Sequence, residues 1–284
     1  MNDHYLLYID VLGFRKLVEE APQRVEELFE ILASLHLHDQ TSFSAIAFSD
    51  TILVHNLNPP VNDHDRESIV TYQCEFFRDL LHRTAGRSFS FRAVLTYGPF
   101  QHYRLNNTPY FYGAALNRAH DTEKSLPITG LLMDDHCYSY NHIFSSHPFA
   151  DDWHYVFVTQ AIDEWEDRYA GMIPLPHILV YETDLGWYLG PEVETLSLSA
   201  DLAQNHPDGR VREKHLATLH QYRNRYPRCF AALENAGFKM EAISRDFAWD
   251  AVRDRMRESF SWASIRRPPR GALRRQPKTK PKNL

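Results

Sequence analysis

The spacing of apolar positions predicts strands alternating with helices over the first 133 residues. Short apolar runs bounded by turn residues indicate strands, and apolar residues that recur every three or four positions indicate helices. The run YLLYI (5–9) predicts a strand that is followed by Asp10 and a turn at Gly13. Runs 43–48 and 51–55 are separated only by Ser49 and Asp50, which is hairpin spacing. Helices are expected over 22–37, 67–83 and 114–124, strands over 89–97 and 128–133, and a loop before 110.

This order of elements predicts an α+β fold. Strand, helix, hairpin, helix, strand, helix, strand is close to the ferredoxin-like βαββαβ plan, a mixed sheet with helices on one face. After residue 133 we expect strands over 153–158 and 177–182, a helix over 162–169, and then helices over 211–226, 228–235 and 240–260. The chain is therefore expected to comprise a core of residues 1–133, an α/β-to-helical extension of residues 134–264 packed on it, and a disordered basic tail of residues 265–284.

Charge is distributed unevenly along the 284 residues. The formal net charge is −6, from 31 Lys and Arg against 37 Asp and Glu. Eight of the basic residues and none of the acids lie in 265–284, so residues 1–264 carry 23 basic against 37 acidic side chains, a net of −14. An acidic globule argues against stable nucleic-acid binding. We interpret the basic tail as a solubilising end rather than a membrane contact.

Cysteine usage and the N-terminus favour a cytoplasmic location. Cys74, Cys137 and Cys229 lie far apart, without the spacing of a disulfide framework or a zinc site. The start of the sequence does not have the basic and apolar regions of a signal peptide. No window approaches the ~20 apolar residues that a membrane-spanning helix needs.

Asp10 and Asp50 are the strongest candidates for chemistry. Asp10 ends the first strand, and Asp50 lies at the tip of the hairpin. In a βαββ arrangement these two elements are neighbours, so both carboxylates would project from one sheet edge. Aspartate also suits tight turns for structural reasons, but paired carboxylates at these positions favour a site for two divalent ions, Mn²⁺ or Mg²⁺, that hold a triphosphate. Backbone amides in the turn around Gly13 could bind phosphate oxygens.

Four short strings carry a family resemblance. They are YIDVLGF (8–14), FSDTILV (48–54), FRAVLTYG (91–98) and YGAALNRAHDTEK (112–124). In this order they resemble the class III nucleotidyl cyclase catalytic domain, and more closely the pyrimidine cyclases of the Pycsar antiphage systems. The resemblance covers about residues 5–133, under half of the chain. It implies a catalytic core there, and a homodimer with active sites across the interface.

The resemblance also implies a role for each matched residue. Asp10 and Asp50 match the two metal-binding aspartates, with the carbonyl of Val11 as a further ligand. Asn117 matches an asparagine that orients the ribose, and Arg92 matches an arginine that contacts phosphate or base. The other residues expected to bind substrate are Gly13, Phe14, Ser49, Tyr110 and Glu123.

Three positions depart from the family pattern. Ile46 and Tyr110 stand where adenylate cyclases have the Lys and Asp that read the purine, which argues against ATP as substrate. Asp121 stands where the transition-state arginine of class III enzymes would fall. An acid cannot stabilise developing phosphate charge, so we expect another cation to do so, with Arg92, Arg104 and Arg118 as candidates.

The function expected from these strings is conversion of UTP to 3′,5′-cyclic UMP and pyrophosphate, as second-messenger synthesis in antiphage defence. A separate cyclic-nucleotide effector would read the product. The alternatives are cyclisation of CTP to cyclic CMP, or a non-catalytic cyclase-like regulatory module. A palm-type polymerase or nuclease would use the same two-metal chemistry, but the net charge of −14 before the tail disfavours it.

Overall fold

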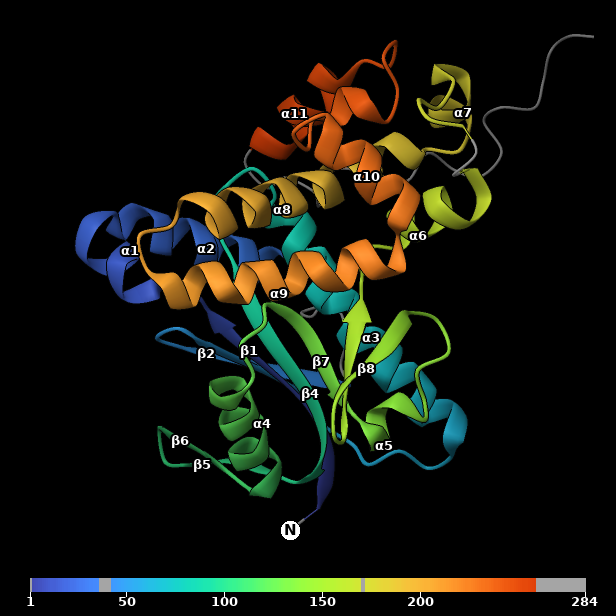
Figure 1. The fold of residues 1–284 in the computed structure, drawn as a ribbon. Helices are drawn as coiled ribbons and strands as arrows, with labels where there is room; N and C mark the ends of the chain where they lie inside the picture. The colour runs from blue at the N-terminus through green and yellow to red at the C-terminus, as the bar shows by residue number, and fades with distance from the viewer. Residues whose placement is uncertain (1, 36–41, 170–171, 259–284) are drawn as a thin grey trace, which may run out of the picture.

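The computed structural model describes residues 2–35, 42–169 and 172–258, which form a seven-stranded sheet, a separate two-stranded hairpin, and helices on both faces and over one end of the sheet (Figure 1). The expected disordered tail of residues 265–284 lies outside the described residues. The strands of the large sheet are β1 (Asp3–Val11), β2 (Phe43–Phe48), β3 (Thr51–Asn56), β4 (Phe91–Pro99), β7 (Gly130–Asp134), β8 (Ser145–Ala150) and β9 (Trp153–Phe157). The hairpin is formed by β5 (Gln101–Leu105) and β6 (Thr108–Tyr112).

The sheet order is β2-β3-β1-β4-β7-β9-β8, and its first four strands follow the βαββαβ plan. Strand β1 lies between β3 and β4 and is antiparallel to both, and β2 is antiparallel to β3. Helices α1 (Phe14–Glu20) and α2 (Pro22–Ser34) connect β1 to β2, and α3 (Asp63–Thr84) connects β3 to β4. The α+β class and the ferredoxin-like core are thereby confirmed.

Alternate residues of β1 face two different helical layers. Tyr5, Leu7 and Ile9 enter a core with α2 and α3, whereas Leu6 and Tyr8 pack against α4 (Ala114–Ser125) on the other side of the sheet. The expectation of helices on one face therefore holds for the crossover helices α2 and α3, and α4 adds a layer on the opposite face. Asp10 belongs to the second set of β1 residues, so it faces the α4 side.

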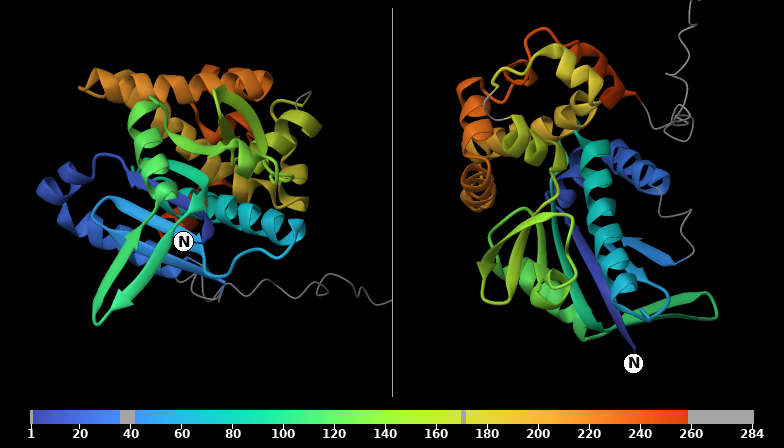
Figure 2. Two further views of the ribbon diagram at one scale, coloured as in Figure 1. Left: turned by 90° about the horizontal axis from the view of Figure 1, so that it is seen from below. Right: turned by 90° about the vertical axis from the view of Figure 1, so that its right-hand side faces the viewer.

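The extension shares the sheet with the core. A second apolar cluster joins Leu132 of β7 and Tyr155 of β9 to buried residues of the C-terminal helices such as Trp165, Leu189 and Phe230. Figure 2 shows these helices stacked over one end of the sheet. They are α6 (Gln160–Glu164) with a π-helix (Trp165–Tyr169), α7 (His177–Glu182), α8 (Leu185–Asn205), α9 (Gly209–Arg225), α10 (Pro227–Asn235), a 3₁₀ turn (Met240–Ala242) and α11 (Trp249–Arg257). The short helix α5 (Asp135–Tyr138) lies away from them and buries Cys137 in the first core.

Several local expectations differ from the structure. The strand expected over 177–182 is wrong, because this segment forms helix α7; six apolar-rich residues are too few to distinguish the two periods. The expected loop before residue 110 contains the β5–β6 hairpin. Helix α8 was not expected, since Gly186, Gly190 and Pro191 are usual helix breakers, yet both glycines let buried side chains approach the helix closely. The helix expected over 240–260 is instead a 3₁₀ turn and α11, with residues 259–260 outside the described ranges.

Within the described residues, no helix has both the length and the apolar character needed to cross a membrane. The three cysteines are buried and free.

Candidate active site

The hairpin turn and the end of β1 bring Asp10 and Asp50 to the same edge of the sheet. The strand register places Asp10 between Thr51 of β3 and Arg92 of β4. The amide of Val11 donates a hydrogen bond to the carbonyl oxygen of Asp50 at 2.8 Å, which fixes the turn to β1. Ser49 takes a left-handed conformation with φ of 52°, a strained backbone that this tight two-residue turn requires.

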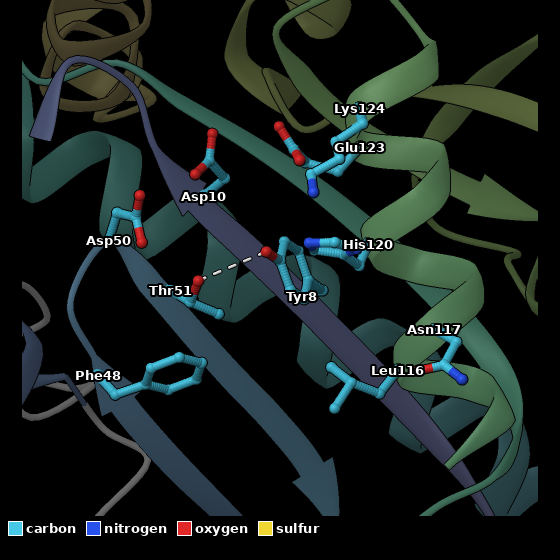
Figure 3. A pocket seen from close by; sticks show the side chains of 10 residues that line it. All are labelled: Tyr8, Asp10, Phe48, Asp50, Thr51, Leu116, Asn117, His120, Glu123 and Lys124. Carbon is cyan, nitrogen blue, oxygen red and sulfur yellow. Dashed lines mark hydrogen bonds between the residues drawn. The ribbon is translucent and has the colours of Figure 1, made fainter. Parts of the chain in front are cut away.

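Both acids line one pocket of about 410 Å³ between β1, the β2–β3 turn and α4 (Figure 3). The close-up shows the two carboxylates on one side and the face of α4 on the other. The lining residues are Tyr8, Asp10, Phe48, Asp50, Thr51, Leu116, Asn117, His120, Glu123 and Lys124.

The electrostatic environment of Asp10 is that of a partly buried acid beside a second acid. Burial raises the pKa of the Asp10 carboxyl above its usual range, and the negative charge of Asp50 adds to this effect. The guanidinium of Arg92 opposes it and is the largest favourable influence on the ionised form. A divalent cation between the two carboxylates would relieve their repulsion, so the pocket favours one.

Arg92 is buried beside the pocket and forms ion pairs with two of the acidic residues that line it. Its Nη2 is 3.5 Å from the Asp10 carboxylate, and the same nitrogen forms an ion pair with Glu123. Its Nη1 donates to the carbonyl oxygen of Leu126 at 3.3 Å. With 6% of its side chain exposed, Arg92 is a buried cation already matched by protein acids.

One face of α4 supplies the opposite wall. Asn117, His120 and Lys124 recur at three- and four-residue spacing and all line the pocket. Asp121, which stands where the family pattern has the transition-state arginine, has 81% of its side chain exposed and is not among the lining residues. The acid that departs from the family pattern therefore does not enter the described pocket.

The position of α4 depends on a close backbone approach at its first turn. Gly113, at φ of 155°, precedes the helix, and an added Cβ there would run into the carbonyl oxygen of Pro99. Only glycine fits this combination of backbone angle and space. The helix is thereby seated against the end of β4, and Asn117 in its first turn is one of the residues that line the pocket (Figure 3).

The expected site residues divide into two groups in the structure. Asp10, Asp50, Asn117 and Glu123 come together around one pocket, with Arg92 bonded to two of them. Other expected residues are not among those that the structure describes around this pocket: Val11, Gly13, Phe14, Ser49 and Tyr110. Gly13 begins α1 in a left-handed conformation, the side chains of Val11 and Phe14 are buried in the core, and Tyr110 stacks on Tyr103 in the hairpin.

Two of the candidate cations also lie elsewhere. Arg118 extends to the buried carboxylate of Asp134 at 2.9 Å and lies over the ring of Trp153. Arg104 belongs to the hairpin, where it donates to the carbonyl oxygen of Asn107 at 3.4 Å.

The expectations from the sequence missed His120 and Lys124 as lining residues, together with Tyr8 and Thr51. A usable signal was present, because His120 and Lys124 lie one and two turns after Asn117 on the same helical face. Tyr8 precedes Asp10 by two residues on the same strand face, and its hydroxyl is 3.4 Å from that of Thr51.

The carboxylate oxygens of the pocket fit a divalent cation that takes its remaining ligands from water and substrate. In the described ranges no group of three or more His, Cys, Asp or Glu residues is arranged to hold a metal ion. Two carboxylates in the wall of one pocket suit Mg²⁺ or Mn²⁺, since Mg²⁺ in particular is usually held by one or two carboxylates together with water and substrate phosphates.

Comparisons with known proteins yield likeness at the level of the fold. No protein-family model matches the chain, and no curated protein matches it. Among solved structures, the adenylyl cyclase CyaB from P. aeruginosa is similar at 14% identity over 55% of this chain and 93% of that chain, with a TM-score of 0.42. A guanylyl cyclase domain of the RhoGC fusion protein from the aquatic fungus Blastocladiella emersonii is similar at 15% identity over 55% and 96%, with a TM-score of 0.45.

Proposed function

We propose that this chain is a metal-dependent nucleotidyl cyclase. The observation that carries the proposal is that Asp10 and Asp50, from two different strands, line one pocket together with Asn117 of α4. Paired carboxylates in one wall of a pocket, opposite polar groups that can hold a sugar, are the parts that an intramolecular phosphoryl transfer needs.

The protein residues would hold the metal and the substrate in complementary ways. Asp10 and Asp50 would bind one or two Mg²⁺ or Mn²⁺ ions, with the carbonyl of Val11 as a further ligand. When bound, these ions neutralise triphosphate charge and lower the pKa of the attacking hydroxyl. Arg92 orients Asp10 through their ion pair, and it compensates Glu123 at the same time.

The proposed reaction forms one bond and breaks one. The ribose 3′ oxygen bonds to the α-phosphorus, the bond from that phosphorus to the bridging oxygen of the β-phosphate breaks, and pyrophosphate leaves with the bonding electrons. The hydroxyl proton passes to solvent. Asn117 would orient the ribose for this attack, and positioning of this kind lowers the barrier by removing the need to find the geometry at random.

We further propose a pyrimidine substrate, with UTP first and CTP as the competitor. Support comes from the sequence resemblance to the Pycsar cyclases and from the two departures at Ile46 and Tyr110, which remove the polar side chains that would read a purine. On the same resemblance we propose that the product is a second messenger in antiphage defence. Gly13, Phe14 and Ser49 remain proposed substrate contacts on the resemblance alone.

A homodimer is part of the proposal. The β5–β6 hairpin extends from the body of the molecule (Figure 2) and exposes Tyr103, Leu105, Tyr110 and Tyr112 by 39–56% each. Aromatic and aliphatic side chains presented on a projecting hairpin suit an interface with a second copy.

The test is a panel of the four ribonucleoside triphosphates, each incubated with the protein and Mn²⁺, with products resolved by chromatography and identified by mass. The proposal predicts cyclic UMP and an equal amount of pyrophosphate. Cyclic AMP as the exclusive product would contradict the pyrimidine assignment, and the absence of a cyclic nucleotide from all four would contradict the cyclase.

A further inference from the structure

Helix α9 of the extension is fixed to the sheet edge that carries the pocket. Figure 1 shows it crossing the end of the sheet where β1 finishes and β7 begins. The hydroxyls of Thr218 and Thr129 are 2.7 Å apart, and Thr218 also accepts a hydrogen bond from the Thr129 amide at 3.0 Å. Thr129 immediately precedes Gly130, which pairs with Arg92 across β4 and β7. These buried bonds attach α9 beside the pair of Arg92 and Asp10.

Lys214 lies one helical turn before Thr218 on α9. Residues four apart lie on one face of a helix, about 6 Å apart along its axis, so Lys214 shares the face that meets the sheet. It is half-buried rather than extended into solvent. Figure 1 shows the N-terminal half of α9 over the end of β1 and the rest of the helix running toward β7. Lys214 belongs to that N-terminal half, and its charge and that of Asp10 each favour the ionised form of the other.

The charge balance of the proposed site requires such a cation. A triphosphate carries about four negative charges, Asp10 and Asp50 add two, and two divalent ions supply only four positive charges. Arg92 and Glu123 cancel one another, so a net of about two negative charges remains for Lys124, which lines the pocket, and one further cation.

We propose that Lys214 binds the phosphate groups of the substrate, so that the extension completes a polyphosphate site begun by the core. This inference rests on the proposed function. The ammonium would approach the triphosphate from the side of Asp10, opposite Lys124 on α4, and the two lysines would then flank the same phosphates. The Thr129–Thr218 bonds would set its position, since they attach α9 to the sheet beside Arg92.

The test uses inorganic tripolyphosphate as the probe, with Mn²⁺ present, and isothermal titration calorimetry on the full chain. Lys214→Met keeps the length of the side chain and removes its charge, and Lys214→Arg keeps the charge. The matched control is Arg210→Ala, which removes an exposed cation from the first turn of the same helix. We expect Lys214→Met to weaken tripolyphosphate binding by about 10-fold or more, as for loss of a charge-assisted contact, and to raise the KM for the nucleotide by a similar factor.

Lys214→Arg is expected to stay within about threefold of the wild-type affinity, and Arg210→Ala to equal it. Unchanged affinity and KM in Lys214→Met, or equal losses in Lys214→Met and Lys214→Arg, would overturn the inference. The binding measurement also separates this inference from the proposed function. If the wild type makes no cyclic nucleotide but binds tripolyphosphate, and Lys214→Met weakens that binding, the cyclase is refuted and the polyphosphate site is supported.

Discussion

The guanidinium of Arg92 lies 3.5 Å from the carboxylate of Asp10 on the neighbouring strand, and it pairs with Glu123 of α4 at the same time. One buried cation thus connects the central strand, its neighbour β4 and the helix that forms the opposite wall of the pocket. Its loss would leave two acids with little exposure and without their counter-charge. The arginine that the family resemblance assigns to substrate contact is, in this structure, tied to the protein's own carboxylates.

Replacement of Arg92 by methionine tests this connection through stability. We expect Arg92→Met to lower the free energy of unfolding by about 3–5 kcal/mol, because Glu123 and Asp10 would remain partly or fully buried without a partner. Denaturant unfolding would measure it. The double variant Arg92→Met with Glu123→Gln should recover a substantial part of the loss, and Arg15→Met, in an exposed pair with Glu19, should leave stability essentially unchanged. A single variant as stable as the wild type would show that the buried pairs contribute little.

Divalent metal should stabilise the folded protein through Asp10 and Asp50. At a free Mn²⁺ concentration of about 100 times its Kd, the gain is about 2.7 kcal/mol, which corresponds to a rise in Tm of roughly 5–10 °C for a chain of this size. Asp50→Asn should abolish that rise. The control is Asp121→Asn, which alters an exposed acid of α4 outside the pocket. This variant should show the same Mn²⁺-dependent rise in Tm as the wild type. An equal Mn²⁺-dependent rise in Asp50→Asn would contradict the metal site.

Gly113 provides a test of how α4 is positioned. Gly113→Ala would place a methyl group against the carbonyl oxygen of Pro99 at a φ of 155°, so we expect a loss of about 3 kcal/mol and displacement of Asn117 from the pocket. Gly86→Ala serves as the control, since Gly86 has φ of +73° but open space around its Cβ position, and should cost only about 1 kcal/mol. Thermal unfolding and nucleotide affinity would be measured on both. Equal effects of the two substitutions would count against a role for the close approach.

Two buried histidines are expected to lower the free energy of unfolding as the pH becomes acidic. Burial lowers the pKa of His55 and of His215 to about 4 in the folded state. The unfolded chain takes up these protons first as pH falls from about 6.5, so the free energy of unfolding should decrease between about pH 6.5 and 4, by up to ~1.4 kcal/mol per pH unit for each proton. His215→Leu should flatten this slope by about one proton, whereas His147→Gln, at an exposed position, should not. An unchanged slope in His215→Leu would contradict the assignment.

The core strands and crossover helices were predictable because their apolar periods are regular and their turns carry recognisable residues. The 5–9, 43–48 and 51–55 runs became β1, β2 and β3 with only small changes at their ends. Helix α8 was missed because tertiary packing of Gly186 and Gly190 against buried side chains outweighs their low helical propensity, which the sequence pattern does not show. The 177–182 run was misassigned because six residues fit both periods.

The candidate site was predictable where it depends on strand ends and not where it depends on longer-range packing. Asp10 and Asp50 meet because topology alone places the hairpin beside β1. The position of Lys214 near the pocket depends on the contact between the Thr129 and Thr218 hydroxyls, which attaches α9 to the sheet. These two residues are 89 positions apart in the sequence, so local patterns do not predict their contact. The exposed position of Asp121 likewise depends on the rotation of α4, which Gly113 sets.

The most direct test of the central claim is to measure the ratio of cyclic UMP to pyrophosphate formed from UTP under one set of reaction conditions. Wild-type protein, Asp50→Asn and Asp121→Asn would each be incubated with UTP and Mn²⁺, and cyclic UMP and pyrophosphate would be quantified together. The account predicts equal amounts of both products from the wild type and Asp121→Asn, and a loss of at least about 100-fold in Asp50→Asn. Equal product formation by Asp50→Asn and the wild type, or pyrophosphate without any cyclic nucleotide, would contradict it.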